Sequence, residues 1–120
     1  MRPYTKKRAA RNRQAKPFRD AMLIEVPLCE VCNRNATSEV HEIARGTANR
    51  QKAQDKPYAV LVVCWTCHMG PLSSRAEWPE ARQLAALRRS RRADFDLEAY
   101  NLLVGRNPER ITIEDVDVFE

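Results

Sequence analysis

Two stretches in the middle of the chain carry the hydrophobic patterns of β-strands. From Thr37 to Ile43 polar and apolar residues alternate, which places Val40 and Glu42 on one face of a strand and His41 and Ile43 on the other. His41 and Glu42 therefore cannot both face one ion unless the strand is bulged or ends there. The apolar run 58–63 predicts a buried strand, and the polar residues 46–56 predict a loop or short helix.

Helical spacing appears on both sides of these strands. Residues 17–26 predict a short helix that begins with Pro17 at its first position, and Pro79 opens another that runs to about Ser90. The second helix turns two leucines inward and ends in a basic segment that suits the helix dipole. The inward leucines are Leu84 and Leu87, and the basic residues are Arg82, Arg88, Arg89, Arg91 and Arg92.

Two further helices are predicted near the C-terminus. Asp94 or Asp96 caps the first, which is closed by Gly105 and Pro108. Thr112 caps the second, with an apolar contact between the residues before and after the cap. Leu97, Tyr100, Asn101 and Val104 have helical spacing in the first, and the apolar contact of the second joins Ile111 and Val116. The last helix is short and acidic, and it either packs on the body or meets a basic surface of a partner or of the N-terminal arm.

All four cysteines lie in two Cys-x-x-Cys pairs, Cys29 with Cys32 and Cys64 with Cys67. Each pair can place two thiolates on one tight turn, and two such turns supply the four ligands of a structural Zn²⁺. Two disulfides are an alternative, although each would close a loop too small to constrain much. A redox Cys-x-x-Cys motif usually occurs once, beside a βαβ unit, whereas this chain has two such motifs and no βαβ pattern. Structural zinc is the favoured interpretation.

The two histidines of the chain, His41 and His68, fall within the cysteine-bounded segment. A four-thiolate zinc is closed and needs neither, so one interpretation is that both are ordinary surface or core residues. If one zinc ion joins the two Cys-x-x-Cys turns, here called the first and second knuckles, the histidines can approach each other. A second, open metal site would then lie beside the closed one.

Positive charge is concentrated at the N-terminus. Residues 1–19 hold eight basic residues and no acidic one, so that with a net charge of +5 for the chain the remainder carries −3. Such a run is often a solvated segment, but it also suits a phosphate backbone. The basic residues proposed for DNA binding are Lys6, Lys7, Arg8, Arg11, Arg13, Arg50 and Lys52.

The pattern of residues 28–70 resembles the zinc-stapled HNH endonucleases, especially small phage-type ones. It combines the two cysteine pairs, the Val-His-x-Ile strand, a Gly-x-x-Asn-Arg segment that ends at Arg50, and a histidine directly after the last cysteine. The resemblance implies a ββα-metal core, a catalytic divalent ion, and hydrolysis of DNA phosphodiester bonds. It also implies that His41 and His68 bind that ion, that Asn49 orients the site and that Arg50 holds phosphate.

Glu42 departs from the family pattern, because most relatives have the general-base histidine there. A glutamate either accepts the proton from water, or binds Mg²⁺ or Mn²⁺ directly, or marks an inactive site. Ala59, where an asparagine is typical, adds weight to the inactive alternative, a zinc-stapled DNA-binding or adaptor protein. A third alternative is a protein-interaction module whose tail binds RNA or an acidic partner.

The expected architecture is α+β, a zinc-stapled HNH-like core with added N- and C-terminal helices. We expect a basic, flexible arm at 1–16, the core at 17–72, and a helical extension at 73–120 that packs on the core. No apolar run reaches the length of about 18 residues that a membrane span needs, so an intracellular, cytoplasmic protein is expected, in the host cell if it is phage-encoded. A protein partner at the acidic C-terminus is also possible on this pattern.

Overall fold

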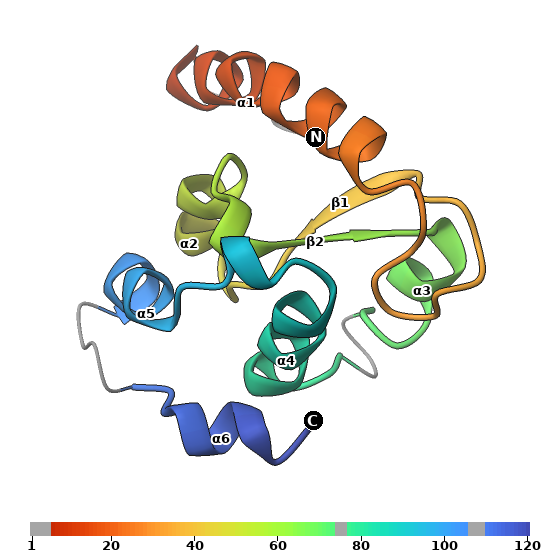
Figure 1. Cartoon of the computed structure of the whole chain (residues 1–120). Helices are drawn as coiled ribbons and strands as arrows, with labels where there is room; N and C mark the ends of the chain where they lie inside the picture. Colours follow the sequence, from red (N-terminus) through yellow and green to blue (C-terminus); the bar gives the residue numbers. More distant parts are fainter. Residues whose placement is uncertain (1–5, 74–76, 106–109) are drawn as a thin grey trace.

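A computed structural model describes residues 6–73, 77–105 and 110–120. Within these residues the chain is an α+β protein with six α-helices and one antiparallel sheet of two strands (Figure 1). The predicted helix stop at Pro108 lies outside the described residues. None of the described helices has the length and apolarity needed to cross a membrane.

The sheet is a short ribbon with two different faces. Strand β1, Glu39–Glu42, pairs with β2, Val60–Val63, so that His41 lies opposite Leu61 and Glu42 opposite Val60. Alternation along the strands sends Val40, Val60 and Val62 to one face, as the sequence pattern predicts, and leaves β2 buried throughout. Both strands are shorter than predicted. The second begins at Val60 because residues 57–59 form a 3₁₀ turn, η1.

Helix α1, Lys6–Glu25, covers the first face of the sheet (Figure 1). The prediction that this helix begins at Pro17 is wrong, because the proline lies inside it, and residues 6–16, assigned from sequence to a flexible arm, form its first half. Proline cannot donate to the carbonyl four residues earlier, but its fixed φ is helical. Burial of Ala15 and Met22 on either side of Pro17 holds the helix together.

The other face of the sheet carries the main core. Helix α4, Glu80–Ser90, begins directly after Pro79 and inserts Leu84 and Leu87 beside Leu61 and Ile43, as predicted. Figure 1 shows the sheet between α1 and α4. Helix α2, Thr47–Ala53, lies between the strands in sequence, and α3, Trp65–Met69, follows β2.

The C-terminal segment is part of the same core. Asp96 accepts from the Ala99 N–H at the start of α5, Leu97–Gly105, and Thr112 forms a full capping box at α6, Ile113–Asp117. Tyr100, Ile111 and Val116 are buried in one cluster with Cys29 and Ile43. The predicted core and its extension therefore share one hydrophobic interior. A second 3₁₀ turn, η2, spans Arg92–Asp94 between α4 and α5.

Candidate functional site

The four cysteines form one compact cluster. Their sulfur atoms all lie within 4.8 Å of one another, and Cys32 Sγ is 4.0 Å from Cys64 Sγ. A tetrahedral zinc with Zn–S bonds of about 2.3 Å places its sulfurs about 3.8 Å apart, which this spacing matches closely. All four cysteines are free, so the cluster contains no disulfide. The donor set is suited to a closed metal site such as structural zinc.

Local backbone structure presents these thiols. The first knuckle turns at Asn33, which has a φ of 55° and donates its N–H to the carbonyl of Cys29. In the second knuckle Cys64 caps α3, and its sulfur accepts the Cys67 N–H. Burial raises the pKa of the Cys64 thiol, but hydrogen bonds from the Asn35 amide and from Cys67 outweigh it and lower that pKa to about 6. A thiolate at Cys64 is ready to bind a metal.

A buried ion pair fastens the first knuckle to the body. Glu30 is 1% exposed; its Oε1 accepts the Val62 N–H at 2.8 Å, and its Oε2 lies 2.8 Å from Arg91 Nε. Arg91 also donates to the carbonyls of Pro57 and Val60. The sequence explained Arg91 only as a helix-dipole partner, and no local pattern marks a pair separated by 61 residues.

The two histidines meet beside this cluster. His41 comes from β1 and His68 from α3, and their ring centroids are 5.2 Å apart at an interplanar angle of 66°. The sequence-based expectation that joined knuckles bring the histidines together is therefore met by the geometry. Both rings line a hollow of about 430 Å³.

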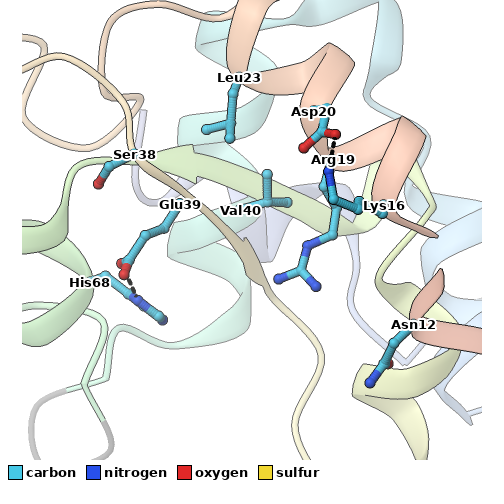
Figure 2. Close-up of a pocket in the computed structure, with 9 residues that line it drawn as sticks. All are labelled: Asn12, Lys16, Arg19, Asp20, Leu23, Ser38, Glu39, Val40 and His68. Atoms are coloured by element: carbon cyan, nitrogen blue, oxygen red, sulfur yellow. Dashed lines mark hydrogen bonds and ion pairs between the residues drawn. The ribbon is translucent and has the colours of Figure 1, made fainter. Parts of the chain in front are cut away.

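Each histidine is held through one ring nitrogen. His41 is buried, and its Nε2 lies 3.0 Å from Oε1 of Gln83 on α4. Nδ1 of His68 pairs with the carboxylate of Glu39, and Figure 2 shows these two side chains pointing toward each other. Burial and the nearby His68 ring lower the pKa of His41 to about 4. His41 is therefore neutral near pH 7, as a metal ligand must be.

The hollow combines these rings with charges of both signs. Its wall includes His41, Glu42, His68, Arg19 and Arg50. The hollow is lined from both faces of β1, since Val40 and Glu42 from one face line it together with His41 from the other. Arg50 is steadied by a bond from its Nε to the Ala44 carbonyl and lies 3.7 Å from Glu77.

A second hollow of about 420 Å³ adjoins the first along α1. The two share Arg19, Val40 and His68 as lining residues, and Figure 2 shows Arg19 reaching from α1 beside Val40. Lys16 also lines it, and its ammonium pairs with Asp20 one turn away. The groove between α1 and the strands is therefore basic on its α1 side and contains the Glu39 carboxylate on its strand side.

Several residues predicted for the site lie elsewhere. Asn49 does not line the histidine hollow, since its amide donates to the carbonyls of Arg45 and Val104 on the α5 side of α2. Lys52 lines a different hollow, which it shares with Arg11. The remaining basic residues proposed for DNA binding lie in the first half of α1 and are not among the residues that line the histidine hollow. They are Lys6, Lys7, Arg8 and Arg13.

The histidine site supplies fewer protein ligands than the cysteine cluster. Across residues 6–73, 77–105 and 110–120, the four cysteines are the only group of three or more Cys, His, Asp or Glu side chains that could hold a metal ion. Two histidines alone would leave the remaining coordination positions of an ion to water or to other ligands. Gln83, the residue that sequence reasoning missed, lies 42 positions from His41 and outside every motif.

Comparison with protein-family models, with curated proteins and with solved structures finds no match to this chain. The structure is that of an α+β protein with a four-cysteine cluster able to hold a metal ion.

Proposed function

We propose that this chain is a divalent-metal-dependent HNH-type endonuclease that hydrolyses DNA phosphodiester bonds and is stapled by a structural zinc on its four cysteines. The observation that carries the proposal is the meeting of His41 and His68 in one hollow beside the cysteine cluster. This arrangement supports the resemblance in the sequence, because it brings His41 of β1 beside His68, which follows the second knuckle. The basic residues around the hollow suit a phosphate substrate.

His41 and His68 would hold the catalytic ion, each through the ring nitrogen that its protein partner leaves available. When bound, Mg²⁺ or Mn²⁺ supplies Lewis-acid stabilisation of the charge that develops on phosphate oxygens. Arg50 and Arg19, on the wall of the hollow, would bind the phosphate and orient it. Glu42 lies at the end of β1 on the same wall and would accept a proton from the attacking water.

The test is conversion of supercoiled plasmid to nicked or linear DNA by zinc-loaded protein with added Mg²⁺ or Mn²⁺. Divalent ions are withheld in the negative arm rather than chelated, so that the cysteine cluster keeps its metal. We expect His41→Ala and His68→Ala each to abolish cleavage. Thr66→Ala, at an exposed position on the same helix as His68, is the matched control and should cut normally.

A zinc-stapled DNA-binding protein without catalysis is the second candidate. It is favoured by Glu42 in the general-base position and by the lack of a third protein ligand near the histidines among the described residues. Salt-sensitive DNA binding with no cleavage across metals and across single- and double-stranded substrates would favour this candidate over the nuclease. Cleavage that survives both histidine substitutions would exclude the proposed site.

A further inference from the structure

Gln83 makes two hydrogen bonds that together leave it no freedom. It is fully buried on α4; its Nε2 donates to the Trp78 carbonyl at 2.9 Å, and its Oε1 lies 3.0 Å from His41 Nε2. A buried amide is costly unless it is paired, and here both ends are paired. A leucine would fill the same space without that cost, so packing alone does not account for a glutamine at this position.

The direction of each bond follows from the groups involved. A backbone carbonyl only accepts, so the amide must turn its NH₂ toward Trp78. Its oxygen then faces His41, and because that oxygen also only accepts, His41 Nε2 must carry the hydrogen. In a neutral imidazole the other nitrogen, Nδ1, then has a free lone pair.

We propose that Gln83 is a positioning residue that fixes His41 as the Nε2–H tautomer and so makes Nδ1 the nitrogen that binds the divalent ion. The inference rests on the proposed function for its metal, but the tautomer itself does not. Ligating histidines are commonly oriented in this way by an acceptor on the second nitrogen. Glu39 holds the opposite ring in the site, His68, through Nδ1. The site would therefore use one nitrogen of each type.

The first measurement needs no variant beyond the one that assigns the signals. Zinc-loaded protein labelled with ¹⁵N-histidine gives only two imidazole spin systems, and His68→Ala assigns them. A long-range ¹H–¹⁵N correlation spectrum at about pH 8, above the ordinary histidine pKa of about 6.5, distinguishes the protonated ring nitrogen from the unprotonated one. We expect His41 as a single Nε2–H tautomer. A predominant Nδ1–H tautomer would overturn the inference.

The second measurement uses Gln83→Met, which has a similar shape and no acceptor oxygen. We expect a mixture of His41 tautomers and a Mn²⁺ affinity about 10–100-fold weaker, measured by calorimetry on zinc-loaded protein. Gln54→Met is the matched control, because Gln54 is also buried and bonds Gln51 instead of a histidine.

The outcomes separate the two proposals. A His41 tautomer that is unchanged in Gln83→Met would overturn the positioning role, whatever the cleavage activity. A tautomer that depends on Gln83, in a protein that binds no Mn²⁺ and cuts no DNA, would uphold the contact and overturn the nuclease. Weaker Mn²⁺ binding with the tautomer lost and zinc content unchanged would support both.

Discussion

At the scale of single residues, the site differs from the family it resembles chiefly at Glu42. The carboxylate lies on the wall of the histidine hollow, half-buried, where β1 ends. Its neighbours there include Arg19 and Arg50. A carboxylate can accept a proton from water in place of a histidine, and an amide cannot, so the proposed role of Glu42 can be measured.

Glu42→Gln tests this role directly. If Glu42 takes the proton from water, the variant should lower the rate of plasmid cleavage by about 10²–10⁴-fold, because the amide cannot act as a base. Mn²⁺ affinity should change little, since in the proposed site His41 and His68 would hold the ion. Glu42→His, which restores the residue typical of the resembling family, should recover cleavage. Full activity in the glutamine variant would assign the base to another group.

Arg91 gives the sharpest prediction on stability. Arg91→Met leaves the Glu30 carboxylate buried without its cation and should lower the free energy of unfolding by about 3–5 kcal/mol. Adding Glu30→Gln to the same chain should recover much of the loss, since the buried charge is removed. The measurement is urea denaturation of zinc-loaded protein.

The control for this pair is Arg89→Met, an exposed arginine of the same helix, where a change within about 0.5 kcal/mol is expected. Equal effects of the two arginine variants would mean that the buried pair contributes no more than a surface charge.

At the scale of elements, α1 is a long helix with a weak point in its middle. Pro17 has no N–H for the Arg13 carbonyl, so the turns before it are joined to the turns after it by one backbone bond fewer. We predict that residues 6–16, which place Ala15 in the core, open more readily than residues 18–25, which pack on the sheet through Phe18 and Met22.

Pro17→Ala should tie the two halves together. An interior proline costs about 3 kcal/mol relative to alanine, so amide hydrogen exchange of residues 6–16 should slow by up to about 100-fold. Gln14→Ala, at an exposed position in the same helix, changes no backbone bond and should have little effect. Exchange rates that do not change in the Pro17 variant would show that the first half is held by side-chain contacts instead.

Local signals predicted most of the elements, and the cysteine pairs predicted one grouping of distant residues, but other long-range contacts left no signal in the sequence. The capping box at Thr112 and the inward leucines of α4 follow from spacing within a few residues, and the structure confirms both. The approach of His41 to His68 also followed from the cysteine pairs. By contrast, Arg91 and Gln83 bond to residues 61 and 42 positions away, and only the packing of α4 against the sheet brings them there. Packing on the opposite face of the sheet, which buries Ala15 and Met22, likewise keeps α1 helical on both sides of Pro17.

At the scale of the whole molecule, the cysteine cluster connects the two knuckles to the core. Cys29, Cys64 and Cys67 are themselves members of the main hydrophobic cluster. Burial, together with hydrogen bonds among the neighbouring thiols, raises the pKa of Cys67 and disfavours its thiolate. A metal bound by the cluster would neutralise the thiolates and would connect both knuckles to the core.

Removing the metal should unfold the protein as a unit. Zinc binding of this kind contributes on the order of 10 kcal/mol, which is comparable to the whole stability of a domain of this size. Titration with a thiol-modifying reagent should release one zinc per chain after four thiols react, with simultaneous loss of the near-ultraviolet signal of Trp65 and Trp78. Zinc release that leaves this signal intact would show that the core folds without the metal.

Positive charge is unevenly distributed over the molecule, and we therefore expect α1 to govern DNA affinity. The helix exposes Lys6, Lys7 and Arg13 along its first turns, while the chain beyond residue 19 is net negative. Each phosphate neutralised contributes about 0.9 to the slope of log affinity against log salt concentration. Replacing these three residues with alanine should therefore weaken binding to a duplex oligonucleotide and lower that slope by up to about 3.

The matched control replaces Arg89 and Arg92, two exposed arginines at the end of α4 and in η2, and should leave the slope nearly unchanged. Fluorescence anisotropy across a series of salt concentrations, without divalent ions, measures both sets. If the two sets lower the slope equally, DNA binding depends on total charge and α1 has no special place in it. If only the α1 set does, the first turns of α1 contact the DNA backbone, as the proposed function expects.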